Sequence, residues 1–143
     1  MFTKQVSVFL ENKSGRLADV TGLLAEAGLN IRALCLADTA DFGVLRIIVD
    51  DRPRCVRILK AHDLAVQETD VLAVEIPDRP GALHEIVAVL DDEEVSVEYM
   101  YTLLSRTGGK AIVVFKSDDA ARAVEALKGA GLALVPDDMI ENL

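Results

Sequence analysis

The sequence contains the same pattern twice, and this internal repeat limits the possible folds more than any other feature. Residues 77–83 (PDRPGAL) correspond to residues 11–17 (ENKSGRL), 66 positions earlier, and each segment follows an apolar, strand-like run. The register continues without a gap, so that Gly43 aligns with Gly109. A repeat of this length predicts a duplicated domain, because a solenoid needs several shorter units. We therefore expect two domains, at residues 1–68 and 69–143.

Each half predicts the same order of elements. Residues 6, 8 and 10 are expected on one side of a strand and residues 7, 9 and 11 on the other, while Leu83, Ile86 and Leu90 share one helical face with Val87. In the same way, we expect Leu17, Val20, Leu24 and Ala27 to face inward. The expected strands are residues 4–11, 30–37, 44–49 and 64–69, then 71–76, 95–104, 110–116 and 132–135; the expected helices are residues 16–27, 51–62, 82–92 and a last helix to residue 128, capped by Asp118.

This βαββαβ order is that of a ferredoxin-like unit, in which two helices cover one face of an antiparallel sheet. Turns are expected at residues 12–15, 39–43 and 105–109, and Gly28 and Gly131 are expected to end helices. Residues 136–143 are too short and polar to assign. The sequence therefore predicts an α+β protein of two ferredoxin-like units.

Size and composition suggest a globular protein. A unit of about 70 residues buries only roughly 60% of its unfolded surface, so we expect the two halves to share an interface. Hydrophobic residues make up 51% of the chain, which is enough for a core. No apolar run approaches the roughly 20 residues of a membrane span, and the N-terminus lacks the pattern of a signal peptide. We expect a cytoplasmic protein without a membrane partner.

The net charge of −9 is unevenly distributed. Residues 1–68 carry nine basic and nine acidic side chains, whereas residues 69–143 carry six and fifteen. An acidic surface repels phosphate backbones, so a nucleic acid is not expected as a direct partner. The acidic run at residues 91–94 lacks the spacing of a calcium loop and is expected to be a solvated helix end.

Neither a catalytic constellation nor a metal site is predicted. Cys35 and Cys55 form no CxxC motif, and we expect both to be reduced and buried thiols. His62 and His84 lie on different helices without metal-ligand spacing. The GGK sequence at residues 108–110 precedes a strand rather than a helix, so it predicts a hairpin turn instead of a phosphate loop. The expectation is a binding module without a cofactor, not an enzyme.

The duplicated loop is chemically suited to an anion. Each loop ends in a glycine, Gly15 or Gly81, directly before a helix. The first N–H groups of a helix have no intrahelical partner and lie at the positive end of its dipole, so they can hold a carboxylate. The alternative is an ordinary strand–turn–helix corner in which these residues only form turns and caps.

The duplicated motif resembles that of the ACT domain. The matching pattern is a strand, then [Asn/Asp]-[Lys/Arg]-x-Gly-x-Leu, then a helix, then [Asn/Ser]-[Ile/Val]. The six-residue motif stands at residues 12–17 and again at 78–83, and the last pair is Asn30-Ile31 or Ser96-Val97. The resemblance covers nearly the whole chain, twice. It implies a small regulatory module that binds amino acids and is free-standing, with its two sheets joined side by side into eight strands.

The resemblance also implies a ligand site between two ACT units. The ligand carboxylate would bind the N–H groups near Gly15 or Gly81, and Asn12 or Asp78 would accept from the ammonium group. Asn30 or Ser96 would reach the site from the neighbouring unit; Asp78 with Ser96 departs from the commoner pattern, which leaves the second site in question. The implied ligand-binding set is Asn12, Ser14, Gly15, Arg16, Leu17, Asn30, Ile31, Asp78, Pro80, Gly81, Ala82, Leu83, Ser96 and Val97, with Arg32, Cys35, Met100 and Tyr101 as further wall candidates.

Three functions are consistent with the resemblance. The first is a homodimeric or otherwise homo-oligomeric sensor that binds a free amino acid and signals to an enzyme of amino-acid metabolism. The second is a regulatory subunit that assembles with a separate catalytic chain, as the small subunit of acetolactate synthase does. The third is a transcriptional co-regulator similar to glycine-cleavage repressors, although the sequence has neither a basic face nor a helix-turn-helix for direct DNA contact.

Overall fold

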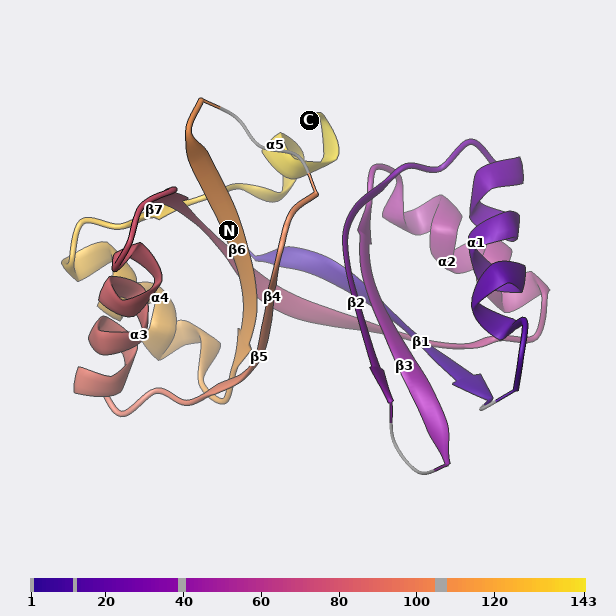
Figure 1. Cartoon of the computed structure of the whole chain (residues 1–143), viewed down its shortest axis with the longest axis horizontal. Helices are drawn as coiled ribbons and strands as arrows, with labels where there is room; N and C mark the ends of the chain where they lie inside the picture. The colour runs from indigo at the N-terminus through magenta and orange to yellow at the C-terminus, as the bar shows by residue number, and fades with distance from the viewer. Residues whose placement is uncertain (1, 12, 39–40, 105–107) are drawn as a thin grey trace. The chain divides into compact units, whose positions relative to one another are not determined.

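A computed structural model describes residues 2–11, 13–38, 41–104 and 108–143 and has seven strands and five helices in these ranges (Figure 1). The described chain divides into two compact units. The N-terminal unit consists of Lys4–Thr69 with Glu141–Leu143, and the C-terminal unit consists of Asp70–Ile140 together with Phe2 and Thr3. Both units have the predicted ferredoxin-like α+β fold.

The N-terminal unit contains β1 (Thr3–Glu11), α1 (Arg16–Glu26), β2 (Ile31–Asp38), β3 (Phe42–Val49), α2 (Arg52–Ala61) and the first part of β4 (Ala65–Pro77). Its strand order is β2-β3-β1-β4, with β3 antiparallel to both β1 and β2. Val20 and Leu24 of α1 and Leu59 of α2 pack into one core with residues of β1. The two helices therefore cover the same face of the sheet (Figure 1).

The C-terminal unit repeats this arrangement. It contains the rest of β4, then α3 (Ala82–Asp92), β5 (Val97–Thr102), β6 (Lys110–Ser117), α4 (Ala120–Gly129), β7 (Ala133–Leu134) and a short helix, α5 (Asp137–Glu141). Its strand order is β5-β6-β4-β7, and all its strand pairs are antiparallel. The order matches that of the N-terminal unit strand for strand.

The two cores correspond almost residue for residue. In the N-terminal unit, β1, α1, β3 and α2 supply eleven of the twelve buried core residues, and Leu29, after α1, is the twelfth. The equivalent elements of the C-terminal unit also supply eleven, and Val95, after α3, is the twelfth. Pairs that occupy the same place are Val6 and Leu72, Val8 and Val74, Val20 and Ile86, Leu24 and Leu90, Leu45 and Val113, and Leu59 and Leu127.

The register of the repeat changes at the hairpin, so the predicted gap-free alignment is wrong there. Leu10 pairs with Gly43, and the equivalent residue Ile76 pairs with Ala111. Gly43 therefore corresponds to Ala111 and not to Gly109. The second hairpin is two residues longer, because eight residues separate the paired residues Leu36 and Leu45, whereas ten separate Thr102 and Val113.

Four helices end in the same way, with a left-handed residue that reverses the chain. After α1, the Gly28 N–H donates to Ala25 O and the Leu29 N–H donates to Leu24 O, both at 3.0 Å. These two bonds form a Schellman motif, and Gly28 and Gly131 end their helices as predicted. After α2 and α3 the left-handed residues are Asp63 and Glu94, with φ of 59° and 58°.

Other details differ from the predictions. The expected strands at 64–69 and 71–76 form one strand, β4, so the described strands number seven instead of eight, and the side-by-side joining of the sheets stays a prediction. Asp119, not Asp118, caps α4 by accepting a bond from the Arg122 N–H at 3.1 Å. Leu17, Leu83 and Val87 are exposed rather than buried, and Cys35 is only half-buried. Turn residues 39–40 and 105–107 lie outside the described residues.

Candidate functional site

Both repeated loops end in a left-handed glycine directly before a helix. Gly15 precedes α1 with φ of 88°, and Gly81 precedes α3 with φ of 87°. Neither helix start has a side-chain cap. A left-handed backbone is strained for any residue with a Cβ atom, so glycine suits both positions. The nearly identical angles show that the repeat preserves the backbone of the corner as well as its sequence.

The predicted loop residues surround these two corners. Ser14, Asp78 and Pro80 are exposed, as are the first-turn leucines Leu17 and Leu83. Arg16 is half-exposed, whereas its counterpart Ala82 is buried in the core of the C-terminal unit. Asn12, which we expected to accept from a ligand ammonium group, lies outside the described residues.

A cavity of about 280 Å³ lies beside the N-terminal corner. Arg16 and Leu17 contribute one wall, and the β2–β3 hairpin contributes another. The hairpin lies there because Glu11, at the end of β1, is paired with Phe42, at the start of β3. The residues that line the cavity are Leu10, Glu11, Lys13, Arg16, Leu17, Leu36, Ala37, Asp38 and Gly43.

The predicted site includes none of the four hairpin residues that line this cavity. Leu36, Ala37 and Asp38 end β2, and Gly43 faces them from β3. The antiparallel strand order of a ferredoxin-like sheet brings this hairpin next to the end of β1. The predicted topology is therefore enough to indicate that hairpin residues lie beside the loop.

Charges of both signs alternate around the N-terminal corner. Glu11 lies 3.0 Å from Lys13 and 3.5 Å from Arg16, and Arg16 lies 4.0 Å from Asp19. The hydrogen bond from Lys13 and the two nearby positive charges lower the pKa of the Glu11 carboxyl. At the C-terminal corner, Arg79 instead pairs with Glu85 at 2.9 Å. Each corner therefore has a guanidinium group close to the helix start.

The residues that open the second strands lie at the other end of the helix within each unit. The Asn30 N–H donates to the Asp50 carboxylate at 3.0 Å, and the Ser96 N–H donates to Asp118 at the same distance. The eleven residues of α1 separate Asn30 and Ile31 from Gly15 by about 16 Å along the helix. The same holds for Ser96 and Val97. A single unit does not bring these residues to its own corner.

The four wall candidates have different environments. Arg32 is half-buried and donates from Nη2 to the Glu141 carbonyl at 3.1 Å. Cys35 is half-buried, Met100 packs against the C-terminal core, and Tyr101 is buried. None of the four lines the 280 Å³ cavity.

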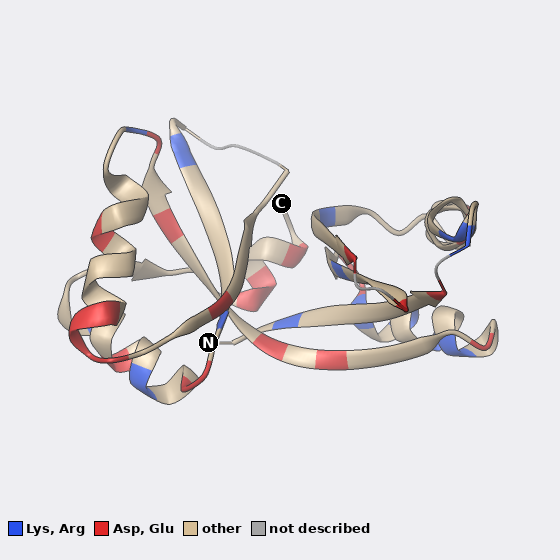
Figure 2. Cartoon of the chain, turned by 60° about the horizontal axis from the view of Figure 1, so that its bottom comes forward, with Lys and Arg blue, Asp and Glu red and all other residues tan. Residues whose placement is uncertain are grey.

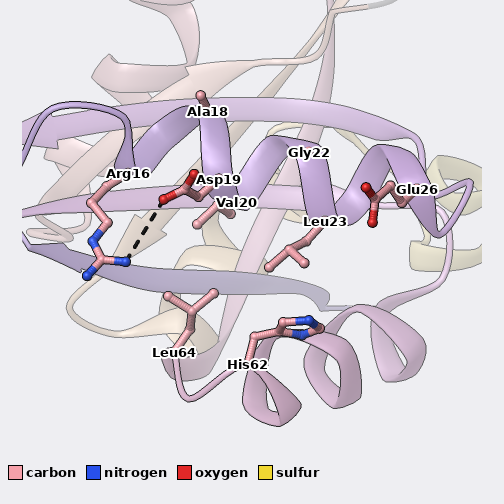
Figure 3. A pocket seen from close by; sticks show the side chains of 9 residues that line it. All are labelled: Arg16, Ala18, Asp19, Val20, Gly22, Leu23, Glu26, His62 and Leu64. Atoms are coloured by element: carbon pink, nitrogen blue, oxygen red, sulfur yellow. Dashed lines mark ion pairs between the residues drawn. The ribbon is translucent and has the colours of Figure 1, made fainter.

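A second and larger cavity of the N-terminal unit lies between α1 and the segment that joins α2 to β4. Its volume is about 440 Å³, and Arg16, Leu23, His62 and Leu64 are among its lining residues (Figure 3). A third cavity next to it shares Arg16, His62 and Leu64. Arg16 therefore lines all three cavities.

The described residues show neither a metal cluster nor a membrane span. Within the ranges that the structure describes, no group of three His, Cys, Asp or Glu side chains is arranged to hold a metal ion. No helix in these ranges is both long enough and apolar enough to cross a bilayer. Acidic residues mark the helices and turns of the C-terminal unit, whose excess of negative charge is visible in Figure 2.

Comparisons with known proteins agree with this geometry. The family model described as "ACT domain pair" matches residues 1–143. Protein BT0572 from Bacteroides thetaiotaomicron is 40% identical and has a TM-score of 0.92, with 100% of this chain and 98% of that chain covered. The ligand-free regulatory subunit of aspartate kinase from Thermus thermophilus is 13% identical with a TM-score of 0.62, covering 89% and 91% of the two chains. No curated protein sequence matches the chain.

Proposed function

Because this chain belongs to the ACT domain pair family, we propose that it is a regulatory protein that binds a free amino acid and signals to an enzyme of amino-acid metabolism. The proposed binding site is the loop–helix corner of the N-terminal unit. The observation that carries the proposal is the 280 Å³ cavity beside this corner, with Arg16 and Leu17 in its wall. No reaction is proposed for the chain itself.

The chemistry of the corner suits an α-amino acid. The first N–H groups of α1, after Gly15, offer donors and a positive dipole end to the ligand carboxylate. The Glu11 carboxylate lines the same cavity and can accept from an ammonium group. Leu10, Leu17 and Leu36 add apolar wall for a side chain. Asn30 and Ile31 would be contributed by a second ACT unit.

The C-terminal corner is proposed as a weaker site. Its glycine has the same backbone, but Ala82 replaces the arginine at the helix start and is buried. The sequence pair Asp78 and Ser96 also departs from the commoner family pattern. We propose that the N-terminal corner binds first, and that Pro80, Gly81, Leu83 and Val97 form a site of lower affinity.

A thermal-shift screen with the twenty amino acids tests the proposal. A ligand that binds only the folded state stabilises it by roughly 2.7 kcal/mol at a hundred times its dissociation constant, so a ligand raises Tm in a concentration-dependent way. Gly15→Val should remove the shift, because it strains the corner. Gly28→Val is the matched control, since Gly28 has φ of 71° at the other end of the same helix and no atom lies within 4 Å of an added Cβ at either position.

The proposal fails if no amino acid raises Tm, or if Gly15→Val and Gly28→Val retain equal ligand shifts. The second result would show that the amino acid binds somewhere other than the corner. Isothermal titration of the hit with both variants gives the affinity ratio directly.

A second candidate function is assembly with a separate catalytic chain. The exposed side chains of Leu34 and Leu36 on β2 favour it, because this strand lies at the edge of the strand order. The Thermus thermophilus neighbour, similar in fold, is the regulatory subunit of aspartate kinase. Size-exclusion chromatography with the catalytic chain of the aspartate kinase from the same organism tests this function. Co-elution that is lost in Leu34→Lys would support it, and separate elution at micromolar concentrations would contradict it.

A further inference from the structure

We propose a second ligand site in the N-terminal unit, in the groove between α1 and the segment joining α2 to β4, that takes a free amino acid with an apolar side chain. This inference adds a second site to the proposed function, and the two sites share Arg16 as a lining residue. The groove is the 440 Å³ cavity. That volume lies within the range of about 300–1,000 Å³ typical of small-molecule sites.

The floor of the groove is apolar. Leu23 and Leu64 are half-buried and supply its exposed apolar surface, and Val20 beneath them is fully buried. Figure 3 shows Val20 and Leu23 pointing down from α1 toward Leu64, which faces them from the opposite side. Gly22 leaves the rim open, because no atom lies within 4 Å of the place where its Cβ would be. A bound hydrocarbon side chain would therefore remove apolar surface from water at this point.

One end of the groove has the two charges that an amino acid head group requires. The Arg16 guanidinium and the Asp19 carboxylate lie 4.0 Å apart at the rim (Figure 3). An α-amino acid has a carboxylate and an ammonium group close together, so it can pair with both residues at once. The exposed Arg16–Asp19 pair contributes little stability, so a ligand can separate it at low cost.

The Arg16 Nε–H gives independent support for an acceptor at this end. This atom is buried, and it has no hydrogen-bond partner among the described residues. A buried donor without an acceptor is unfavourable, so a ligand carboxylate that reached Nε would stabilise the complex. Glu11 lies 3.5 Å from Nη2 of the same guanidinium and 3.0 Å from Lys13, and its contact with Nη2 leaves Nε without an acceptor.

The other end of the groove selects against a second anionic group. Glu26 lines this end, and His62 lies between it and Leu64 (Figure 3). The His62 Nδ1 is 2.9 Å from the Ile58 carbonyl, and only a protonated Nδ1 can donate to a carbonyl. In a neutral imidazole, Nε2 would then be an acceptor. The Glu26 carboxylate therefore disfavours an acidic ligand side chain and tolerates an apolar one.

The C-terminal unit has a cavity at the equivalent place, but its lining lacks the charge pair of the groove. Arg16 corresponds to Ala82, which is buried, and His62 corresponds to Ala130. The cavity at the far end of α3 is instead lined by three carboxylates, those of Asp92, Glu93 and Glu125. The equivalent elements of the C-terminal unit thus lack the guanidinium group. The C-terminal unit therefore serves as an internal control for binding that depends on Arg16.

An NMR titration of the whole chain with L-leucine tests the proposal. We expect amide shifts at Gly22, Leu23 and Leu64 as leucine is added to about 10 mM, a range that detects millimolar binding. Saturable shifts at these residues support the site. Shifts confined to Leu17, Leu36 and Gly43 would overturn it while supporting the corner site, and a complete absence of shifts would overturn it as well.

Two variants separate this site from the corner, because neither residue lines the 280 Å³ cavity. Gly22→Phe fills the groove and should weaken the leucine response at Leu64 by about tenfold or more. Asp19→Asn should weaken leucine by a similar factor but leave 4-methylpentanoate, which lacks the ammonium group, unchanged. The matched controls are Ala88→Phe and Glu85→Gln, at the equivalent positions of α3; they should bind leucine as the unmodified protein does. Equal affinity in Gly22→Phe, Asp19→Asn and their controls would overturn the proposal.

Discussion

At the residue scale, two helices end on a charged residue where glycine would be less strained. Glu94 has φ of 58°, whereas its counterpart in the N-terminal unit is Gly28. A left-handed conformation costs a residue with a Cβ about 1–2 kcal/mol, partly offset by the greater chain entropy of glycine. We therefore expect Glu94→Gly to raise the free energy of unfolding by up to about 1 kcal/mol in urea titrations. Glu93→Gly is the control, because φ there is −95°; an equal gain in that variant would contradict the explanation.

The two cysteines should differ sharply in reactivity. Burial raises the pKa of the Cys55 thiol from its ordinary value of 9.0 to about 11, with the nearby Asp51 and Asp50 carboxylates adding to the effect. Cys35 is half-buried on β2. Iodoacetamide at pH 8 should therefore modify Cys35 alone, giving one adduct by mass spectrometry and two in denaturant. The folded state retains the Cys55 proton between pH 9 and 11 and the unfolded state does not, so this contribution to stability is lost as pH rises through that window. Rapid native labelling of Cys55 would disprove the assignment.

At the element scale, two adjacent aspartates have different roles: Asp119 caps a helix, and Asp118 accepts a hydrogen bond from the residue before a strand. Asp119 accepts from the Arg122 N–H at the start of α4, and Asp118 accepts from the Ser96 N–H before β5. Asp119→Ala should lower the free energy of unfolding by about 1 kcal/mol and speed exchange of the first amides of α4. Asp118→Ala should instead speed exchange of the Ser96 amide. If Asp118→Ala instead speeds exchange of the first α4 amides and Asp119→Ala speeds exchange of the Ser96 amide, Asp118 is the cap.

The sequence predicted the elements with strong periodicity and missed those without it. Both βαββαβ units, the helix ends at Gly28 and Gly131 and the corners at Gly15 and Gly81 follow from local patterns. The continuity of β4 was missed because residues 67–70 are polar, although nothing there breaks a strand. Helix α5 has one buried residue, Ile140, and one apolar anchor gives no periodicity. The cavity at the corner needed the β2–β3 hairpin, which is 20 or more residues away in sequence.

At the scale of the whole molecule, duplication has produced two similar frameworks with different surfaces. The cores agree at nearly every position, while the net charge of −9 comes from residues 69–143. Arg16 and its counterpart Ala82 occupy the same place at a helix start, one half-exposed and one buried. Because the two units share a core but not a surface, ligand binding should be unequal between them. The sequence repeat alone predicts two equal sites, and the difference lies in side chains whose exposure only the structure gives.

Self-association is the prediction that belongs to the molecule as a whole. Strand β2 lies at the edge of its unit, and Leu34 and Leu36 are 43% and 49% exposed on it. An exposed edge strand with apolar side chains favours pairing with another chain, and a single charged residue on it opposes such pairing. We expect the protein to sediment as a dimer at micromolar concentrations and Leu36→Lys to sediment as a monomer. Leu104→Lys replaces a residue that is 64% exposed in the C-terminal unit and not on β2, and it should stay dimeric. A monomeric unmodified protein, or a Leu36→Lys variant that remains dimeric, would show that this edge does not carry the association.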